Sequence, residues 1–276
     1  MSTLEANESE EDLGAGQQEE QQEEEQQARS NEDLEGETSQ ARDDEDRDAK
    51  LTLEIALQHG LKWRNVHPRD VFALDQGGRF VISQGSVVGF EGDAIVNAAN
   101  TGCLGGGGVD GAISRAGGAA LQNARLALPI LPGGSSKRCA TGDAVITVGG
   151  DLNARYCIHA VGPMYMSHAN LEEGDRMLRS AYAAAMTRAQ EKNLKTIAFS
   201  LISAGIFRGE QSLERVLEVG AQAIRDASYE GLEEVHMCAF TDEELEAAIQ
   251  AAEFVFAEKD VCDDEHEASE DNAADK

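Results

Sequence analysis

A run of four glycines, Gly105–Gly108, is the feature that most constrains how this chain folds. It follows a short apolar stretch, 94–97, that is typical of a strand, and it precedes a segment where we expect a helix to begin. Glycines let the backbone turn sharply and let a ligand approach without meeting Cβ atoms. Amides at a helix N-terminus point hydrogen-bond donors at an anion. The sequence therefore predicts a strand, a loop and a helix in succession, with a loop that can hold a diphosphate group.

From about residue 80 the chain alternates short apolar runs with longer segments of helical period, the pattern of an α/β domain. Several of the runs are apolar enough to lie between two layers of helices. Helices are predicted at 178–189 and 213–224, where apolar residues recur every three or four positions. Another is predicted after Thr241, which can form a capping box with Glu244. The predicted strands are Phe80–Ser83, Ala94–Asn97, Ala144–Val148, Tyr156–Val161, Thr196–Ile202 and Val235–Phe240.

The net charge of −29 is concentrated at the two ends of the chain. Residues 1–50 hold 19 acidic and 4 basic side chains, and residues 257–276 hold 9 and 2. The first of these segments is a Glu/Gln tract that cannot bury enough apolar surface to offset its ordering entropy. We therefore expect disordered acidic tails at 1–50 and 257–276. Between them we expect an N-terminal extension at 51–79, with a helix at 51–61, and a folded domain at 80–256.

The composition also excludes several classes of partner. An acidic surface repels nucleic-acid phosphates, and no basic stripe with interleaved aromatic residues is visible, so we expect no binding to duplex nucleic acid. The chain has neither a run of 18 apolar residues nor a charged-then-apolar N-terminus, so we expect no membrane span and no secretory signal. The five cysteines form no close pair of the metal-ligand or redox type. We expect a reduced monomer of the cytoplasm or nucleus, without metal or cofactor.

Three other interpretations of the glycine loop compete with a diphosphate site. The loop can be a flexible turn that binds nothing. Gly106, Gly108 and Gly111 also satisfy the G-x-G-x-x-G pattern of dinucleotide-binding proteins. That pattern expects an acidic residue about 20 positions later, but residues 125–140 contain no Asp or Glu. A P-loop is not indicated, because no Gly-Lys-Ser/Thr sequence follows the glycines.

Five motifs resemble those of the macrodomain family and occur in the same order. They are Asn97-Ala98-Ala99-Asn100, the glycine loop ending in Val109-Asp110-Gly111, Cys139–Ala144, Ile158–Pro163 and Ile202–Phe207. The resemblance covers about residues 80–256. It implies a three-layer α/β/α fold with a central mixed sheet. It also implies a cleft at the strand ends that binds ADP-ribose and ADP-ribosylated proteins.

By that resemblance, two loops grip the diphosphate of the ligand. Phe207 would pack against the distal ribose, with ordinary core burial as the alternative, and Asn100 would hydrogen-bond to the ribose hydroxyls. Asn97 is implied to bind the ligand, and the alternative is that its side chain hydrogen-bonds to the backbone at a strand end. The residues implied to bind the ligand are Ser86, Val87, Asn97, Gly105, Gly106, Gly107, Gly108, Val109, Ser203, Ala204, Gly205, Ile206 and Phe207.

The combination of Asn100 and Asp110 resembles the hydrolytic MacroD branch of the family, which releases ADP-ribose from acidic side chains and deacetylates O-acetyl-ADP-ribose. This resemblance implies that Asp110 and Asn100 are catalytic. A carboxylate beside the distal ribose can take a proton from the attacking water. Two alternatives stay open: the diphosphate orients the water while Asp110 holds the ribose, or Asp110 only complements the helix dipole. In a different class of function, the domain binds ADP-ribose without hydrolysing it.

Three positions depart from the family pattern. Ser86 stands where the family has an Asp that binds the adenine amino group, so a weaker adenine contact is expected. Ala204 replaces the usual threonine of the hydrolases, and Arg208 replaces a glycine. Arg208 could reach the diphosphate or close the cleft. His159 lies in an apolar strand and is interpreted as a core histidine, not as a catalytic base.

Overall fold

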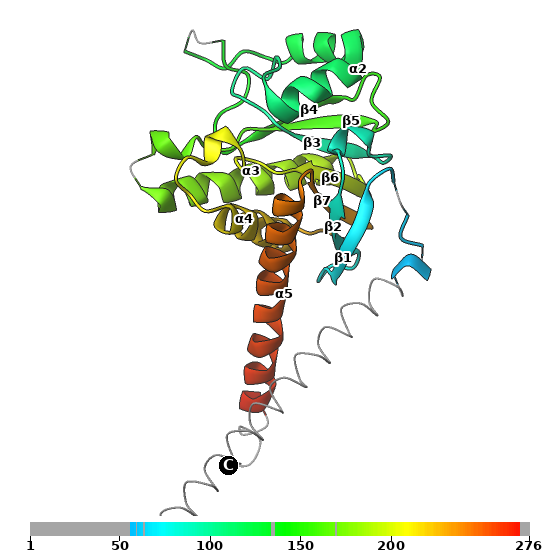
Figure 1. The fold of residues 1–276 in the computed structure, drawn as a ribbon, viewed down its shortest axis with the longest axis vertical. Helices are drawn as coiled ribbons and strands as arrows, with labels where there is room; N and C mark the ends of the chain where they lie inside the picture. Colours follow the sequence, from blue (N-terminus) through cyan, green and yellow to red (C-terminus); the bar gives the residue numbers. More distant parts are fainter. Residues whose placement is uncertain (1–55, 59, 63, 134–135, 169, 271–276) are drawn as a thin grey trace, which may run out of the picture. The chain divides into compact units, whose positions relative to one another are not determined.

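The computed structural model describes residues 56–58, 60–62, 64–133, 136–168 and 170–270, with side chains up to residue 257. Its centre is a mixed seven-stranded sheet with the order β1-β2-β7-β6-β3-β5-β4 (Figure 1). The β1–β2 and β4–β5 pairs are antiparallel, and the pairs between them are parallel. The strands are β1 (His67–Ala73), β2 (Arg79–Gln84), β3 (Ala94–Ala98), β4 (Ala144–Val148), β5 (Tyr156–Ala160), β6 (Thr196–Ser200) and β7 (Glu234–Ala239).

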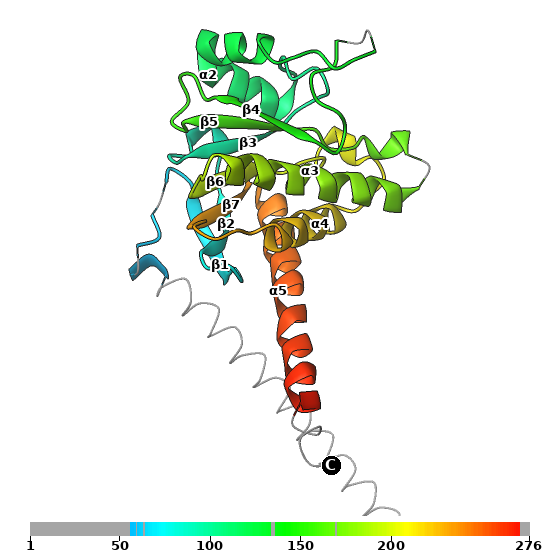
Figure 2. The same cartoon turned by 180° about the vertical axis from the view of Figure 1, so that it is seen from behind.

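Helices cover both faces of this sheet. Along β3, Val96 packs into the core formed with α3, α4 and α5, whereas Ile95 packs on the opposite face with Ile113 and Leu121 of α2. Strands with apolar side chains on both faces need a layer on each side. The prediction of a three-layer α/β/α fold with a central mixed sheet is therefore confirmed. The helices are α2 (Gly108–Leu126) on one face and α3 (Leu171–Glu191), α4 (Leu213–Asp226) and α5 (Asp242–Glu270) on the other (Figures 1 and 2).

Each of the six predicted strands is present, with ends that differ by two residues at most. The seventh strand, β1, was not predicted and lies within the segment 51–79. Its register shifts between Pro68 and Asp70, and a proline and a bulge are both typical of an edge strand. These features interrupt the regular alternation by which a strand is recognised. Residues 56–58 of the predicted helix at 51–61 are helical, and residues 1–55, with the predicted N-terminal tail, lie outside the described residues.

The predicted capping box starts α5. Thr241 Oγ1 accepts a hydrogen bond from the amide of Glu244 at 3.1 Å, and Glu244 Oε2 accepts one from the amide of Thr241 at 3.0 Å. The helix then continues past residue 256, where the domain was expected to end, as far as Glu270. No helix in the described part of the chain has the length and apolar composition needed to cross a membrane.

Helix α2 is bent at Gly118, whose φ of 61° and ψ of −159° lie outside the helical region. Nη1 of Arg125, near the end of the helix, lies 3.0 Å from Oδ1 of Asp110 in the first turn. In a straight helix these two residues would be about 22 Å apart along the axis. The bend at Gly118 is therefore what lets Arg125 contact the start of its own helix.

We expect Gly118→Ala to destabilise the fold. A Cβ at this position would lie 2.1 Å from Oδ2 of Asp151, and the positive φ strains any other residue. The substitution should lower the free energy of unfolding by about 2 kcal/mol. Gly89→Ala is the matched control, because its Cβ would meet no atom nearer than 3.6 Å. Chemical denaturation followed by circular dichroism measures both variants, and equal midpoints would contradict the role assigned to Gly118.

Candidate ligand-binding cleft

A cleft runs along the edge of the sheet where the parallel strands end. The loops after β2, β3, β6 and β7 meet at this edge, because parallel neighbouring strands end on the same side of a sheet. The glycine loop follows β3, and residues 201–205 follow β6. The edge predicted for the site is thus the one where the structure has its cleft.

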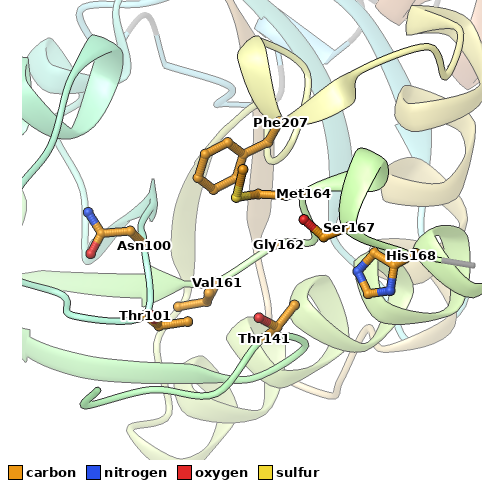
Figure 3. A pocket seen from close by; sticks show the side chains of 9 residues that line it. All are labelled: Asn100, Thr101, Thr141, Val161, Gly162, Met164, Ser167, His168 and Phe207. Atoms are coloured by element: carbon orange, nitrogen blue, oxygen red, sulfur yellow. The ribbon is translucent and has the colours of Figure 1, made fainter. Parts of the chain in front are cut away.

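Three adjoining pockets form the cleft. The Ser86 pocket, of about 470 Å³, is lined by residues that include Ser86, Val87, Ala204, Cys238, Phe240 and Glu244. The central pocket, of about 290 Å³, is lined by residues that include Asn100, Gly106, Gly107, Asp110, Ser203, Ile206 and Phe207. The Thr141 pocket, of about 250 Å³, is lined by Asn100, Thr101, Thr141, Val161, Gly162, Met164, Ser167, His168 and Phe207 (Figure 3). The Ser86 and central pockets share the lining residues Gly108, Val109, Leu201 and Gly205. The central and Thr141 pockets share Asn100, Gly162 and Phe207.

The glycine loop presents its backbone to the central pocket. Gly107 is the N-cap of α2 and makes no side-chain cap, so the first-turn amides are left for an acceptor in the cleft. A Cβ on Gly107 would meet no atom within 4 Å. A Cβ on Gly106 would lie 3.3 Å from both Asn100 Nδ2 and Asp110 Oδ2. The loop therefore combines first-turn amides that have no side-chain cap with room for a ligand, and Gly106 fits between two polar side chains.

A second loop, Ser203–Arg208, contributes Ser203, Gly205, Ile206 and Phe207 to the lining of the central pocket. Ser203 is buried with a φ of 56°, and its Oγ donates to the carbonyl oxygen of Pro163 at 2.8 Å. This hydroxyl therefore fixes the loop. Arg208 donates from Nε to the carbonyl oxygen of Ala204 at 3.1 Å and from Nη1 to that of Gln211 at 2.8 Å. These two hydrogen bonds brace the guanidinium against the backbone that surrounds it.

Asp110 has one anchored carboxylate oxygen and one unpaired oxygen. The residue is only 3% exposed. Its Oδ1 accepts from Asn97 Nδ2 at 2.9 Å and pairs with Arg125 Nη1 at 3.0 Å. Its Oδ2 is buried and finds no hydrogen-bond partner among the described residues, although Asp110 lines the central pocket. A buried carboxylate oxygen without a partner is costly, so Oδ2 is the polar atom that a ligand in this pocket would satisfy.

Asn97 was predicted to contact the ligand, but the structure places it behind the wall of the cleft. It is fully buried, and its Nδ2 lies 2.9 Å from Asp110 Oδ1 and 3.2 Å from His159 Nδ1. Its side chain therefore holds Asp110 and does not serve the backbone at the strand end. His159 is fully buried, as expected for a core histidine, with Nε2 3.0 Å from Thr147 Oγ1. Burial, together with the charge of Arg125, lowers the pKa of His159 to about 3.

Asn100 closes the turn that begins the glycine loop. Its Oδ1 accepts from the amide of Gly102 at 3.0 Å, and its Nδ2 donates to the carbonyl oxygen of Gly105 at 2.9 Å. An amide side chain has two donor hydrogens and two acceptor lone pairs, so each polar atom retains capacity for one more hydrogen bond. Asn100 thus shapes the loop and still faces the central and Thr141 pockets.

The Ser86 pocket has apolar walls and a single charged side chain. Ser86 Oγ accepts from the amide of Val88 at 3.4 Å, so the hydroxyl is engaged locally. Glu244 Oε2 accepts from the amides of Phe240 and Thr241 at 2.8 and 3.0 Å, and the residue lines the pocket. Phe240 also lines the pocket, and the residue is 73% exposed. This pocket suits a flat apolar group that carries a hydrogen-bond donor.

Comparison with known proteins identifies the family. A model of the Macro domain matches residues 96–219. A macro domain-containing protein of Cupriavidus necator is 42% identical over 169 residues, which make up 60% of this chain and 93% of that protein. The chain belongs to the macro domain family.

Further relatives of this macrodomain have more specific names. A protein of Escherichia fergusonii named O-acetyl-ADP-ribose deacetylase is 43% identical over 129 residues, which cover 47% of this chain and 70% of that protein. The solved macrodomain of Oceanobacillus iheyensis with ADP superposes with a TM-score of 0.61 at 25% identity, and the match covers 68% of this chain and 96% of that one. The five motifs found in the sequence therefore led to the correct family.

Most of the predicted site residues of the macrodomain line the cleft. The exceptions are Asn97 and Gly105, neither of which lines any of the three pockets. Sequence reasoning missed Arg125, whose contact with Asp110 depends on the bend in α2. It also missed Glu244, for which the capping-box pattern was visible but indicated only a helix start. The described residues contain no group of three or more His, Cys, Asp or Glu side chains that could hold a metal ion.

Burial of His159 should make the stability of this macrodomain depend on pH. Its pKa is about 3 in the folded protein and near 6.5 when unfolded. The unfolded chain takes up the proton first, so this contribution to stability is complete above pH 6.5 and is lost as the pH falls toward 3. We expect the denaturant midpoint of unfolding to decrease as the pH is lowered from 7 to 4.5. His159 should contribute at most about 1.4 kcal/mol per pH unit to the loss in free energy of unfolding.

The variant His159→Gln should show a shallower decline, because glutamine keeps an amide near Asn97 and Thr147 without a titrating ring. A residual slope is expected from His236, whose pKa is also lowered by burial. His168→Gln, which replaces a histidine outside the core, is the control for the exchange of histidine for glutamine. A decline in His159→Gln as steep as that of the wild type would rule out His159 as its source.

Proposed function

We propose that this macrodomain binds ADP-ribose in the cleft and hydrolyses esters of the distal ribose. It would release ADP-ribose from modified Asp and Glu side chains of proteins and from O-acetyl-ADP-ribose. The observation that carries the proposal is that Oδ2 of Asp110 is buried and unpaired among the described residues. Asp110 lines the same pocket as the first turn of α2, whose amides have no side-chain cap. The ADP in the structure of the Oceanobacillus iheyensis relative and the name of the Escherichia fergusonii relative support it.

The three parts of ADP-ribose match the chemistry along the cleft. The apolar Ser86 pocket suits adenine, with Glu244 as an acceptor for its amino group. The glycine loop and the Ser203–Phe207 loop suit the diphosphate. Charge-assisted hydrogen bonds contribute about 1.5–3 kcal/mol each, so several amides can hold a dianion without a basic side chain. The distal ribose then lies among Asn100, Asp110 and Phe207.

Hydrolysis at this position requires a water molecule that loses a proton as it attacks. Asp110 Oδ2 accepts that proton while the water oxygen bonds to the ester carbon, and the ribose oxygen departs with the proton. The products are a carboxylic acid and ADP-ribose, and the carboxylate of Asp110 is restored. Arg125 and Asn97 hold Oδ1, which fixes the carboxylate and leaves Oδ2, beside Gly106, without a partner among the described residues. The alternative is that Oδ2 holds a ribose hydroxyl while the diphosphate orients the water.

The variant Asp110→Asn tests the role of the carboxylate. We expect the rate of ADP-ribose release to fall by at least about 100-fold. The dissociation constant for ADP-ribose, measured by calorimetry, should change less than about fivefold, because the lost interaction matters mainly in the transition state. Asp110→Asn alone leaves the buried cation of Arg125 without a charged partner, which can impair folding. The double variant Asp110→Asn with Arg125→Gln removes that cation as well, so a rate that stays low in the double variant reports a catalytic defect and not a folding defect.

The outcomes of this experiment separate the possible roles. Unchanged turnover in Asp110→Asn would exclude the carboxylate as the general base. Loss of affinity in parallel with turnover would assign Asp110 to holding the ribose. Tight ADP-ribose binding with no turnover in the wild type would make the domain a non-catalytic reader. No ADP-ribose binding at millimolar concentration, which corresponds to a binding free energy of only about −4 kcal/mol, would exclude both functions.

The variant Gly107→Glu tests the assignment of the diphosphate site. Its side chain would project into open space in the central pocket and place a negative charge where the diphosphate is expected. We expect affinity for ADP-ribose to fall by at least about 100-fold, which corresponds to roughly 2.7 kcal/mol. Gly107→Ala adds only a methyl group at the same position and should lose far less. Calorimetry with ADP-ribose and AMP measures both variants, and undiminished affinity in Gly107→Glu would place the diphosphate elsewhere.

A further inference from the structure

The Thr141 pocket continues the cleft beyond the position proposed for the distal ribose. Asn100 and Thr101 lie on one side of it and Ser167 and His168 on the other, with Phe207 and Met164 facing Thr141 across the space (Figure 3). Asn100, Gly162 and Phe207 also line the central pocket. The two pockets therefore adjoin at these residues, next to the position proposed for the distal ribose.

His168 is the only residue with an ionisable side chain among those that line this pocket. Val161, Met164 and Phe207 provide apolar surface, and Thr141 and Ser167 provide hydroxyl groups. None of its lining residues, all of which are described, is an Asp, Glu, Lys or Arg. A cationic group would find no Asp or Glu side chain among these residues, and an anionic group would find no Lys or Arg. Either group would lose hydration on entering the pocket. The walls thus favour a group that has aliphatic surface and no charge.

The size of the pocket exceeds what an acetyl group requires. Its volume is about 250 Å³, whereas a cavity of about 150 Å³ is known to hold benzene, a molecule of six carbon atoms. An acetyl group has only three non-hydrogen atoms and would leave most of the space unfilled. The volume fits an acyl chain of about six carbons.

We propose that the Thr141 pocket holds the acyl group of an ADP-ribosyl ester and selects uncharged acyl chains longer than acetyl. This inference rests on the proposed function, because it requires a ribose between Asn100 and Phe207. The occupant is the acyl tail of a small O-acyl-ADP-ribose. A glutamyl ester on a protein shares the ester chemistry but brings a peptide backbone, so the two sources can be distinguished by experiment.

The test compares O-acetyl-, O-butyryl- and O-hexanoyl-ADP-ribose as substrates of the full chain. Each methylene buried against the apolar wall should raise kcat/KM about two- to fourfold. Thr141→Phe fills the pocket and should lower the butyryl-to-acetyl ratio of kcat/KM by about tenfold. Thr141→Val, which keeps the shape of threonine, is the matched control and should retain the wild-type ratio. Thr141 is exposed, so both variants are expected to fold.

A binding experiment separates failure of this inference from failure of the proposed hydrolysis. Non-hydrolysable ADP-ribose analogues with the same acyl groups in amide linkage are titrated by calorimetry. If the wild type hydrolyses none of the esters but binds the longer amides more tightly, and Thr141→Phe removes that gain, the pocket assignment holds and the hydrolase proposal fails. Rates and affinities that do not rise with chain length would overturn the inference. The inference would also be overturned if Thr141→Phe changed the rate of hydrolysis of an ADP-ribosylated glutamate peptide but not that of the butyryl ester.

Discussion

The buried ion pair between Asp110 and Arg125 determines how the rest of the cleft is arranged. Arg125 is fully buried and Asp110 nearly so, and removal of either partner would leave an uncompensated charge in the core. The pair joins the two halves of α2, and it forms only because the helix bends at Gly118. Asn97 connects the same carboxylate to the end of β3. The sheet, the helix and the carboxylate of Asp110 are therefore held as one unit.

The cleft suits an anionic ligand although the chain carries a net charge of −29. None of the residues that line the three pockets is a Lys or Arg. The positive character comes from peptide dipoles at the start of α2, which do not depend on side-chain composition. Gly107 has no side chain to cover these dipoles, and the space beside it is open. Composition alone would have argued against a diphosphate site, whereas the arrangement of strand, glycines and helix argued for one.

The sequence predicted those parts of the fold and site that depend on local pattern. Apolar runs located six strands, and the Thr241–Glu244 pair located the start of α5. The parts that it missed depend on contacts between distant segments. Arg125 reaches Asp110 through a bend that no periodicity reveals, and Asn97 turned out to hold Asp110 because both side chains point into the same buried space. The proline and bulge in β1 disguised that strand for a different reason, since they break the alternation itself.

The unrecognised strand β1 also has a consequence for how the protein behaves with other copies of itself. Pro68 has no amide to offer a further strand, and the adjacent bulge disturbs the row of backbone groups at this edge. The sheet is therefore a poor template for strand addition on this side. A shortened chain that began at residue 80 would lose this protection and expose β2, whose Phe80, Val81 and Ile82 are fully buried in the intact fold. Such a fragment would carry a bare apolar edge, which favours aggregation over folding.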